Sequence, residues 1–274
     1  MRAEVVHDSK HAPLSQPNEP AIVYVPGIDG TGALLLGTAA RIEQRYRLLR
    51  MRYVHEGLTG DGALYGTLAS SIAERMDEAG VRGAIVLAES FGGGVALTLA
   101  LKRPDLVRGL MFVNTFCYYP HRVRIRLGAA LVPFTPKRLL RLGRMRLAGK
   151  LFFRPRKDPG AEALFRQAVP GFAAGGYAER MKAIPHLDLR DRLAEIQVPC
   201  DLYWASHDTV VPSKASMAVM HAGLANSTLT TLERANHIVL PLAEEPWVER
   251  LTALAKKAAE AGSLQWGISG VEQA

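Results

Sequence analysis

The sequence predicts an α/β fold, in which helices cover both faces of a mostly parallel sheet. Short apolar runs recur along the chain, such as AIVYV (Ala21–Val25), and resemble strands that are buried on both faces. Segments with apolar residues at helical spacing separate these runs. The 274 residues are enough for a full hydrophobic core in one α/β domain that carries an insertion.

Strands and helices alternate regularly through the first part of the chain. Pro104 ends the helix that follows the third strand, because proline cannot continue a helix. The expected strands cover residues 21–25, 47–51, 83–90 and 106–114. The expected helices cover residues 33–46, a segment that follows the glycine-rich stretch 57–66, and residues 92–102.

The alternation stops between residues 115 and 190, where prolines separate short helical stretches. This pattern predicts a helical lid inserted into the sheet domain. The alternation resumes with strands at residues 199–206 and 227–233, each followed by a helix, at 213–225 and 246–261. We therefore expect a core of residues 20–114 and 191–262, a lid of residues 115–190, and flexible termini at residues 1–19 and 263–274.

The composition is that of an ordinary globular protein, with 48% apolar and 22% charged residues. No run reaches the roughly 18–20 apolar residues of a membrane-spanning helix. The first residues, MRAEVVHDSK, carry charges where a secretory signal has an apolar stretch. Cys117 and Cys200 are too few for a disulfide framework, and no Cys or His spacing resembles a metal site. We expect a cytoplasmic protein, free or peripheral to a membrane, with no metal and no cofactor.

Ser90 carries the sharpest functional signal. The segment VLAESFGGG places this serine at the end of an apolar strand, directly before glycines and a helix. A nucleophile elbow needs this arrangement, because the serine lies on a strained turn and small residues nearby let the backbones approach. The alternative is that Ser90 only caps the following helix. The strand before it and the three glycines after it favour the nucleophile.

The order of a catalytic triad on such a sheet is Ser, then an acid, then His, with the partners on loops after later strands. Asp208 follows the strand that ends in YWAS, and His237 follows the strand STLTTLE. Both residues therefore occupy the expected places independently of Ser90. The alternatives are a loop carboxylate that caps a helix for Asp208, and a surface histidine for His237.

The loop PGIDGTG, residues 26–32, follows the first apolar strand and is called the oxyanion loop below. This position supplies a second N–H donor for an oxyanion. We assign that donor to the Ile28 N–H, with Asp29 N–H as the alternative, beside the Phe91 N–H at the start of the helix after Ser90. The Asp29 side chain either fixes the turn or contacts substrate. Leu34 and Leu35 are candidate contacts for an apolar substrate.

These motifs resemble the α/β-hydrolase superfamily over roughly residues 20–262, through PGIDGTG, AESFGGG, SHDTVVP and ANHIVL. PGIDGTG together with ESFGG is also similar to the hydrolase half of the phytyl ester synthase and diacylglycerol acyltransferase-like family. The resemblance implies an α/β-hydrolase fold, with Ser90, Asp208 and His237 as the triad, and lipid-like acyl substrates. It also implies transfer of the acyl group to an alcohol, but the chain lacks the acyltransferase half, so hydrolysis is favoured.

The positive charge of the chain is concentrated in residues 106–157, which hold thirteen Lys and Arg and no Asp or Glu. Much of this segment belongs to the expected lid, where leucines alternate with arginines. The arginines either extend into water from a helical lid or dock an anionic membrane surface, an acidic carrier or coenzyme A phosphates. The rest of the chain is acidic, so binding of nucleic acid is not expected.

The sequence therefore predicts a serine hydrolase that cleaves apolar acyl esters or thioesters through an acyl-enzyme on Ser90. Its partner is then a small acyl ester or thioester. Two alternatives remain at this point. The first is an acyltransferase that moves the acyl group to an alcohol, and the second is a non-catalytic hydrolase-fold protein that binds lipid or a partner.

Overall fold

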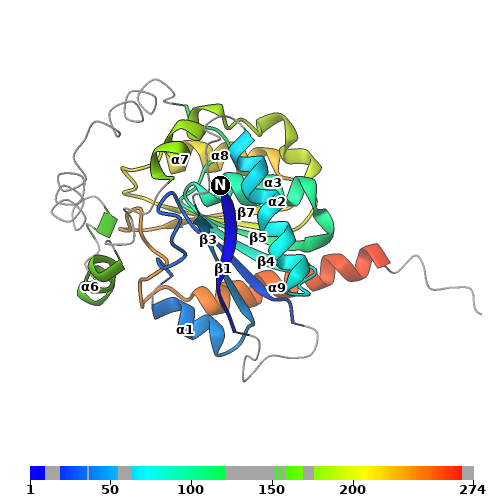
Figure 1. Cartoon of the computed structure of the whole chain (residues 1–274), viewed down its shortest axis with the longest axis horizontal. Coiled ribbons are helices and arrows are strands. Elements are labelled where there is room, and N and C mark those ends of the chain that lie inside the picture. The colour runs from blue at the N-terminus through cyan, green and yellow to red at the C-terminus, as the bar shows by residue number, and fades with distance from the viewer. Residues whose placement is uncertain are drawn as a thin grey trace, which may run out of the picture.

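The computed structural model of the protein describes residues 1–9, 19–35, 37–54, 63–120, 152–153, 155, 158–168 and 176–266. Within these residues, seven strands form a sheet in the order β1-β3-β2-β4-β5-β6-β7 (Figure 1). β1 pairs antiparallel with β3, and every other neighbouring pair is parallel. The strands are β1 (Arg2–Asp8), β2 (Ile22–Val25), β3 (Leu48–Val54), β4 (Ala84–Glu89), β5 (Val107–Val113), β6 (Cys200–Ala205) and β7 (Ser227–Leu232). This mostly parallel sheet confirms the predicted fold class.

Helices connect the parallel strands and cover the sheet, as βαβ crossovers require. The α-helices are α1 (Gly37–Glu43), α2 (Ala63–Glu78), α3 (Gly92–Lys102), α6 (Pro159–Ala168), α7 (Tyr177–Ala183), α8 (Ser213–Gly223) and α9 (Trp247–Trp266). Three short 3₁₀ helices are η1 (Pro104–Leu106), η5 (Ile184–His186) and η6 (Arg190–Glu195).

The sheet separates two hydrophobic cores. α2, α3 and α8 pack on one face, and α1 and α9 pack on the other (Figure 1). β4 shows why both faces are apolar: Val86 and Ala88 belong to the first core, whereas Ile85 and Leu87 belong to the second. Side chains alternate along a strand, so a central strand covered on both faces must be apolar at every position.

The N-terminal residues are better ordered than the sequence analysis expected. Residues 1–19 were predicted to be flexible, but Arg2–Asp8 form β1 at the edge of the sheet. Ala3 is buried, and its N–H and carbonyl both bond the Ser71 hydroxyl of α2. The Arg52 guanidinium binds Glu4 across the β1–β3 pair. β1 was missed in the sequence because its charged residues interrupt the apolar pattern by which a buried strand is recognised.

The helix expected over residues 33–46 is also shorter in the structure. α1 begins only at Gly37, and a turn occupies residues 34–35. At the other end of the chain, α9 continues to Trp266, beyond the expected core boundary at residue 262. Among the described residues, no helix combines the length and the apolar character needed to cross a membrane.

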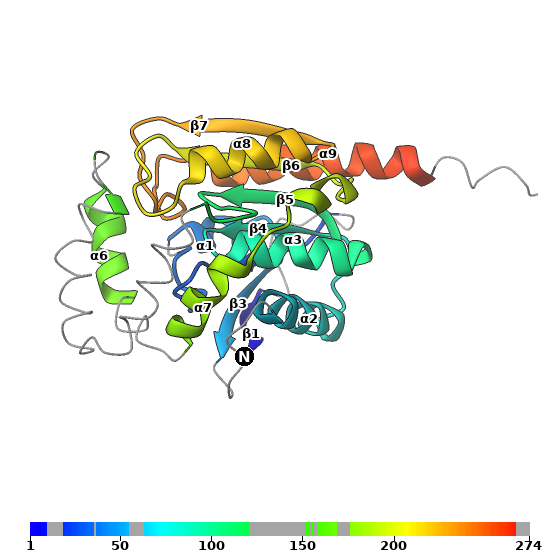
Figure 2. The ribbon, with the colours of Figure 1, turned by 90° about the horizontal axis from the view of Figure 1, so that it is seen from above.

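Part of the segment expected to form the lid lies on the side to which the parallel strands direct their carboxyl ends. Figure 2 shows the arrowheads of β5 and β7 pointing toward the side on which α6 lies. α6 and α7 both belong to the range 115–190. The carboxyl ends of parallel strands are where open α/β sheets bind their ligands.

Candidate active site

Ser90 lies on the sharp turn between β4 and α3, as the elbow motif requires. Its φ of 52° falls in the left-handed region, which a residue other than glycine rarely adopts. The surrounding structure holds this strain: the Ser90 N–H donates to the Val113 carbonyl at 3.0 Å, and the Thr115 hydroxyl donates to the Ser90 carbonyl. The turn therefore directs the Ser90 hydroxyl above the carboxyl edge of the sheet.

Gly92 allows the start of α3 to lie against the oxyanion loop. A Cβ atom at this position would lie 2.5 Å from the carbonyl oxygens of both Val25 and Pro26. Neither oxygen belongs to a side chain that could move, so a larger residue would push α3 and the oxyanion loop apart. This close approach explains the small residue two positions after the serine.

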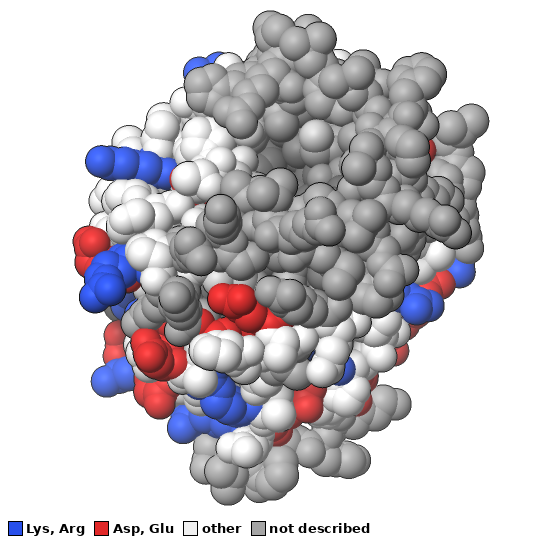
Figure 3. All heavy atoms as spheres, turned by 90° about the vertical axis from the view of Figure 1, so that its left-hand side faces the viewer, with Lys and Arg blue, Asp and Glu red and all other residues white. Residues whose placement is uncertain are grey.

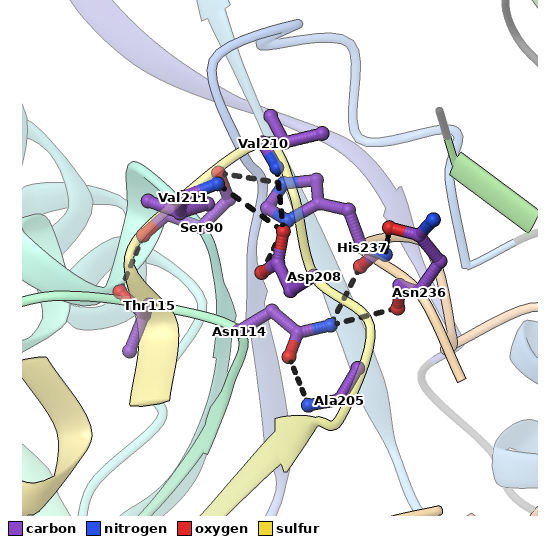
Figure 4. A network of polar contacts seen from close by, with 9 residues as sticks. All are labelled: Ser90, Asn114, Thr115, Ala205, Asp208, Val210, Val211, Asn236 and His237. Atoms are coloured by element: carbon purple, nitrogen blue, oxygen red, sulfur yellow. Dashed lines mark hydrogen bonds and ion pairs between the residues drawn. The ribbon is translucent and has the colours of Figure 1, made fainter. Parts of the chain in front are cut away.

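The three predicted triad residues meet at the carboxyl ends of their strands (Figure 4). His237 Nε2 lies 3.1 Å from the Ser90 Oγ, and His237 Nδ1 lies 2.9 Å from an oxygen of Asp208. The other oxygen of Asp208 accepts the N–H groups of Val210 and Val211 at 2.9 and 3.2 Å. The Asp208 carboxylate is thus fixed by its own loop and oriented toward the imidazole.

The environment of His237 favours its protonated form. Burial alone lowers the pKa of the imidazole, but the charge and hydrogen bond of Asp208, together with the charge of Glu89, outweigh burial. The pKa of His237 is therefore raised above its ordinary value of 6.5. The raised pKa makes the neutral imidazole a stronger base, which accepts a proton more readily from a hydroxyl within hydrogen-bond reach.

Asn114 joins the loops that carry the acid and the base, and the sequence analysis did not single it out. Its amide nitrogen donates to the carbonyls of Asn236 and His237 at 3.2 and 2.7 Å. Its amide oxygen accepts the Ala205 N–H at 2.7 Å, just before the Asp208 loop (Figure 4). Asn114 adopts a positive φ of 46°, a conformation that asparagine tolerates better than most residues. The signal in the sequence was an asparagine at the end of a buried strand.

The backbone of the oxyanion loop is oriented by hydrogen bonds along its own turn. The Gly27 carbonyl accepts the Gly30 N–H at 3.1 Å. In a trans peptide the C=O and N–H point in opposite directions, so the Ile28 N–H points away from that turn. The Asp29 carboxylate accepts the N–H and hydroxyl of Thr31 at 2.8 and 2.5 Å, so it fixes the turn. Asp29 also lines the cavity described next.

A cavity of about 110 Å³ opens beside the Ser90 hydroxyl. Its described lining is mainly apolar and comes from the oxyanion loop, the β4 elbow, the lid range and the loops of the triad partners. Leu34 lines it, but Leu35, the other leucine expected to contact substrate, does not; both side chains are buried in the core between the sheet, α1 and α9. The lining residues are Gly27, Ile28, Asp29, Leu34, Glu89, Ser90, Phe152, Phe165, Tyr177, Val210, His237 and Ile238.

Glu89 is an ionisable residue of the cavity that the sequence analysis missed. It directly precedes Ser90, is 5% exposed, and accepts a short hydrogen bond from the Tyr24 hydroxyl. Burial and the nearby Asp29 charge raise the pKa of Glu89 to about 7, although Tyr24, His237 and the Gly27 N–H act in the opposite direction. A charged residue inside the otherwise apolar run AIVLAES was the signal that could have revealed it.

Replacement of Glu89 by Gln should change how the stability of the protein depends on pH. The pKa of Glu89 is about 7 in the folded state and has the ordinary value of 4.5 in the unfolded state, so the folded state binds the Glu89 proton more tightly. This tighter binding stabilises the folded protein. The stabilisation is complete below pH 4.5 and is lost as pH rises through 7. Gln stays neutral at every pH. Relative to wild type, the variant should gain about 3 kcal/mol of unfolding free energy between pH 4.5 and pH 8.

Urea unfolding of both proteins at pH 5 and pH 8 measures this difference. The exposed Glu233 offers a matched control, because Glu233→Gln removes a carboxylate from the surface and should leave the pH dependence unchanged. An equal effect of Glu89→Gln at both pH values would contradict the assignment of a protonated Glu89.

The described residues offer no metal site: they hold no group of three or more His, Cys, Asp or Glu side chains arranged for a metal ion.

Acidic and basic residues of the described part lie side by side on the face shown in Figure 3. Most of the basic segment 106–157, including Arg138, Arg141, Arg144 and Arg146, lies outside the described residues. Docking of the lid on a membrane or an acidic carrier therefore stays a prediction.

Comparison with known proteins identifies the family. Residues 67–244, more than half of the chain, match the family described as Serine aminopeptidase, S33. The chain belongs to this family. This family match, together with the hydrolase structures that superpose on the chain, confirms the α/β-hydrolase superfamily expected from the motifs.

Similar proteins match this chain over most of its length. The chain is 27% identical over 228 residues to a Klebsiella pneumoniae protein named "Putative carbamate hydrolase RutD", covering 77% of this chain and 82% of that protein. An esterase from Exiguobacterium antarcticum superposes with a TM-score of 0.73 at 21% identity, covering 86% and 92% of the two chains. An enol-lactonase from Burkholderia xenovorans superposes with a TM-score of 0.67 at 20% identity, covering 90% and 93%.

Proposed function

We propose that this S33 family member hydrolyses carboxylic esters or thioesters of apolar acyl groups through an acyl-enzyme on Ser90. The observation that carries the proposal is the chain of contacts from Ser90 Oγ to His237 Nε2 at 3.1 Å and from His237 Nδ1 to Asp208 at 2.9 Å. A serine hydroxyl is a weak nucleophile until a neighbouring base takes its proton. His237 lies within reach of that proton.

In the first half-reaction the Ser90 Oγ attacks the carbonyl carbon of the substrate while His237 Nε2 takes the hydroxyl proton. The carbonyl oxygen becomes an oxyanion, which the N–H groups of Phe91 and Ile28 bind. When the tetrahedral intermediate collapses, the bond to the leaving group breaks, and His237 returns the proton to that group. Asp208 keeps the imidazole in the required tautomer and stabilises its charged form.

In the second half-reaction water takes the place of the leaving group. His237 removes a proton from the water, and the hydroxide attacks the acyl carbon of the ester on Ser90. The oxyanion returns to the same two N–H groups, and collapse releases the carboxylic acid with the proton passing back to the Ser90 Oγ. The free serine is then ready for another substrate.

The shape of the cavity supports an apolar acyl group. Phe152, Phe165 and Ile238 line it next to His237, and Leu34 lines it from the oxyanion loop. Phe152 and Phe165 also contact each other, with ring centroids 5.5 Å apart. Burial of apolar substrate surface against these side chains contributes about 25 cal/mol per Å². This energy favours acyl chains over small polar substrates.

A second candidate reaction is the hydrolysis of a carbamate. It is supported by the relatives named "Putative carbamate hydrolase RutD", which match most of the chain at 24–27% identity. A carbamate has the same carbonyl carbon and the same leaving oxygen as an ester, so the same groups would act on it. The two candidates differ only in the atom on the acyl side of the carbonyl.

A panel of p-nitrophenyl esters with graded acyl chains, acyl thioesters and a p-nitrophenyl carbamate tests the proposal. We expect a rapid burst of about one nitrophenolate per enzyme followed by a slower steady state, which is typical of an acyl-enzyme that accumulates. Faster turnover of the carbamate than of every ester would favour the second candidate. Absence of turnover on the whole panel would contradict both.

The same assay separates hydrolysis from acyl transfer to an alcohol, which the sequence analysis kept as an alternative. A medium-chain alcohol added at millimolar concentration should not divert the acyl group if water is the natural acceptor. Formation of the new ester faster than release of the acid would instead assign acyl transfer to the chain.

A further inference from the structure

The oxyanion loop is held from outside by one buried arginine, Arg180 of α7. The side chain is 1% exposed, although arginine is among the residues least often buried. Its Nε donates to the Ile28 carbonyl at 2.8 Å, and one terminal nitrogen donates to the Asp29 carbonyl at 3.2 Å. The other terminal nitrogen contacts the Met1 sulfur at 3.5 Å. One guanidinium group thus binds two successive peptides of the loop.

These two bonds determine how the loop peptides are oriented. The Ile28 carbonyl and the Asp29 N–H belong to one planar peptide, and the Asp29 carbonyl and the Gly30 N–H belong to the next. With both carbonyls turned toward Arg180, the Asp29 N–H must point away from it, and the Gly30 N–H closes the turn onto Gly27. Neither peptide can rotate without breaking a charge-assisted bond to the guanidinium. The adjoining Ile28 N–H is held through the same backbone.

Tyr53 of β3 fixes the position of both the loop and the arginine. Its hydroxyl donates to the Pro26 carbonyl at 2.9 Å, and its N–H donates to the Gly30 carbonyl at 2.8 Å. The Arg180 guanidinium lies over the Tyr53 ring, 5.6 Å from its centroid. Gly30 has a φ of +69°, and a Cβ there would approach both Arg180 and Tyr53 to 3.0 Å. The Arg180 guanidinium is therefore packed closely against Gly30 and the Tyr53 ring.

We propose that Arg180 is a positioning residue for the oxyanion hole, which links the lid range to the donors of the oxyanion loop through the Ile28 and Asp29 carbonyls. This inference rests on the proposed function, because it assigns a role in stabilising the oxyanion. Arg180 touches neither the substrate nor Ser90. It acts by keeping the loop N–H groups directed at the place where the charge develops.

The side chain at position 180 must donate hydrogen bonds to two successive carbonyls of the oxyanion loop at once. Lysine at position 180 retains the positive charge, but its single nitrogen cannot span two carbonyls as a planar guanidinium does. We therefore expect the Arg180→Lys variant to fold with a loop that is held at one point only. An oxyanion donor displaced by a fraction of an ångström loses much of its effect on the transition state and little of its effect on substrate binding.

Kinetics with p-nitrophenyl butyrate and a matched pair of ketones test the proposal on Arg180→Lys. A pentyl trifluoromethyl ketone accepts the Ser90 Oγ at its carbonyl carbon, the hydroxyl proton passes to His237, and the ketone oxygen becomes an oxyanion. The corresponding methyl ketone binds without this addition. We expect kcat to fall about 10- to 100-fold with KM nearly unchanged. Affinity for the trifluoromethyl ketone should fall by a similar factor, and affinity for the methyl ketone should stay constant.

Lys182→Met is the matched control, because Lys182 is an exposed cation on the same helix and its removal should change none of these values. Wild-type kcat and wild-type ketone affinities in a folded Arg180→Lys protein would overturn the proposal. Equal losses of affinity for both ketones, or a variant that does not fold, would also overturn it, since either result assigns Arg180 to the structure alone. If Ser90→Ala leaves hydrolysis intact, the proposed function itself fails, and this outcome is distinct from the others.

Discussion

Replacement of Ser90 by Ala should lower kcat for p-nitrophenyl ester hydrolysis by about 10⁴-fold or more while KM changes little. The substitution removes only the hydroxyl group, whose oxygen lies 3.1 Å from His237 Nε2 in the wild type. The variant therefore has neither a nucleophile at position 90 nor a proton there for His237 to accept. The variant keeps the apolar cavity, so substrate binding remains. Residual turnover should reflect the oxyanion donors alone. Steady-state kinetics on wild type and variant measure the loss.

Labelling with a fluorophosphonate probe provides an independent reading of the same variant. The probe should label wild-type protein at Ser90 and fail to label Ser90→Ala. Ser70→Ala on α2 is a suitable control, because its hydroxyl accepts a bond from Lys102 and lies outside the cavity lining. Full labelling of the Ser90→Ala protein would disprove the assignment of the nucleophile and favour a hydrolase-fold protein that only binds.

Replacement of Asp208 by Asn should lower kcat by about 10⁴-fold and shift the acid limb of the pH profile to lower pH. Hydrolysis requires neutral His237, and its pKa is raised above 6.5, so the acid limb of the wild-type profile should reach half of its maximum at a pH above 6.5. Burial lowers the pKa of His237, whereas the charge and hydrogen bond of Asp208 raise it. Removal of the carboxylate charge leaves burial dominant, and the pKa then falls.

The profile of kcat/KM against pH, recorded from pH 4.5 to 9 for both proteins, shows the two effects separately. Asp201 on β6 is a matched control: it is also a buried carboxylate, but it pairs with Lys257 at 2.8 Å, away from the cavity. Asp201→Asn should keep the acid limb in place. An unchanged acid limb in Asp208→Asn would mean that Asp208 does not set the protonation of His237.

The features that the sequence predicted well depend on neighbouring residues. The elbow at Ser90 follows from a buried strand, a serine and glycines in direct succession, and β4 and α3 have nearly the expected bounds. Asp208 and His237 were found because parallel strands end at one edge of a sheet, so the loops after them converge. The convergence of these loops then brings three residues that are distant in the sequence together. β1 was missed because it is an edge strand with charged residues, and it lacks the apolar run that reveals a buried strand.

The residues that the sequence did not predict act through contacts with distant parts of the chain. Asn114 donates a hydrogen bond to the His237 carbonyl, and Arg180 donates one to the Ile28 carbonyl. Glu89 accepts a hydrogen bond from the Tyr24 hydroxyl. Each pair is separated by 65 residues or more. Such bonds depend on how helices and loops pack, and their strength falls within a few tenths of an ångström.

The sequence by itself determined the strand–helix alternation, the elbow at Ser90 and the order of its partners, because backbone propensity and side-chain periodicity are local properties. Only the tertiary structure decided that Glu89 is enclosed beside the Ser90 hydroxyl, that Leu35 packs in the core rather than in the cavity, and that Arg180 reaches the oxyanion loop. The physical reason is that burial, hydrogen-bond direction and charge interactions depend on three-dimensional proximity, which residue order does not specify.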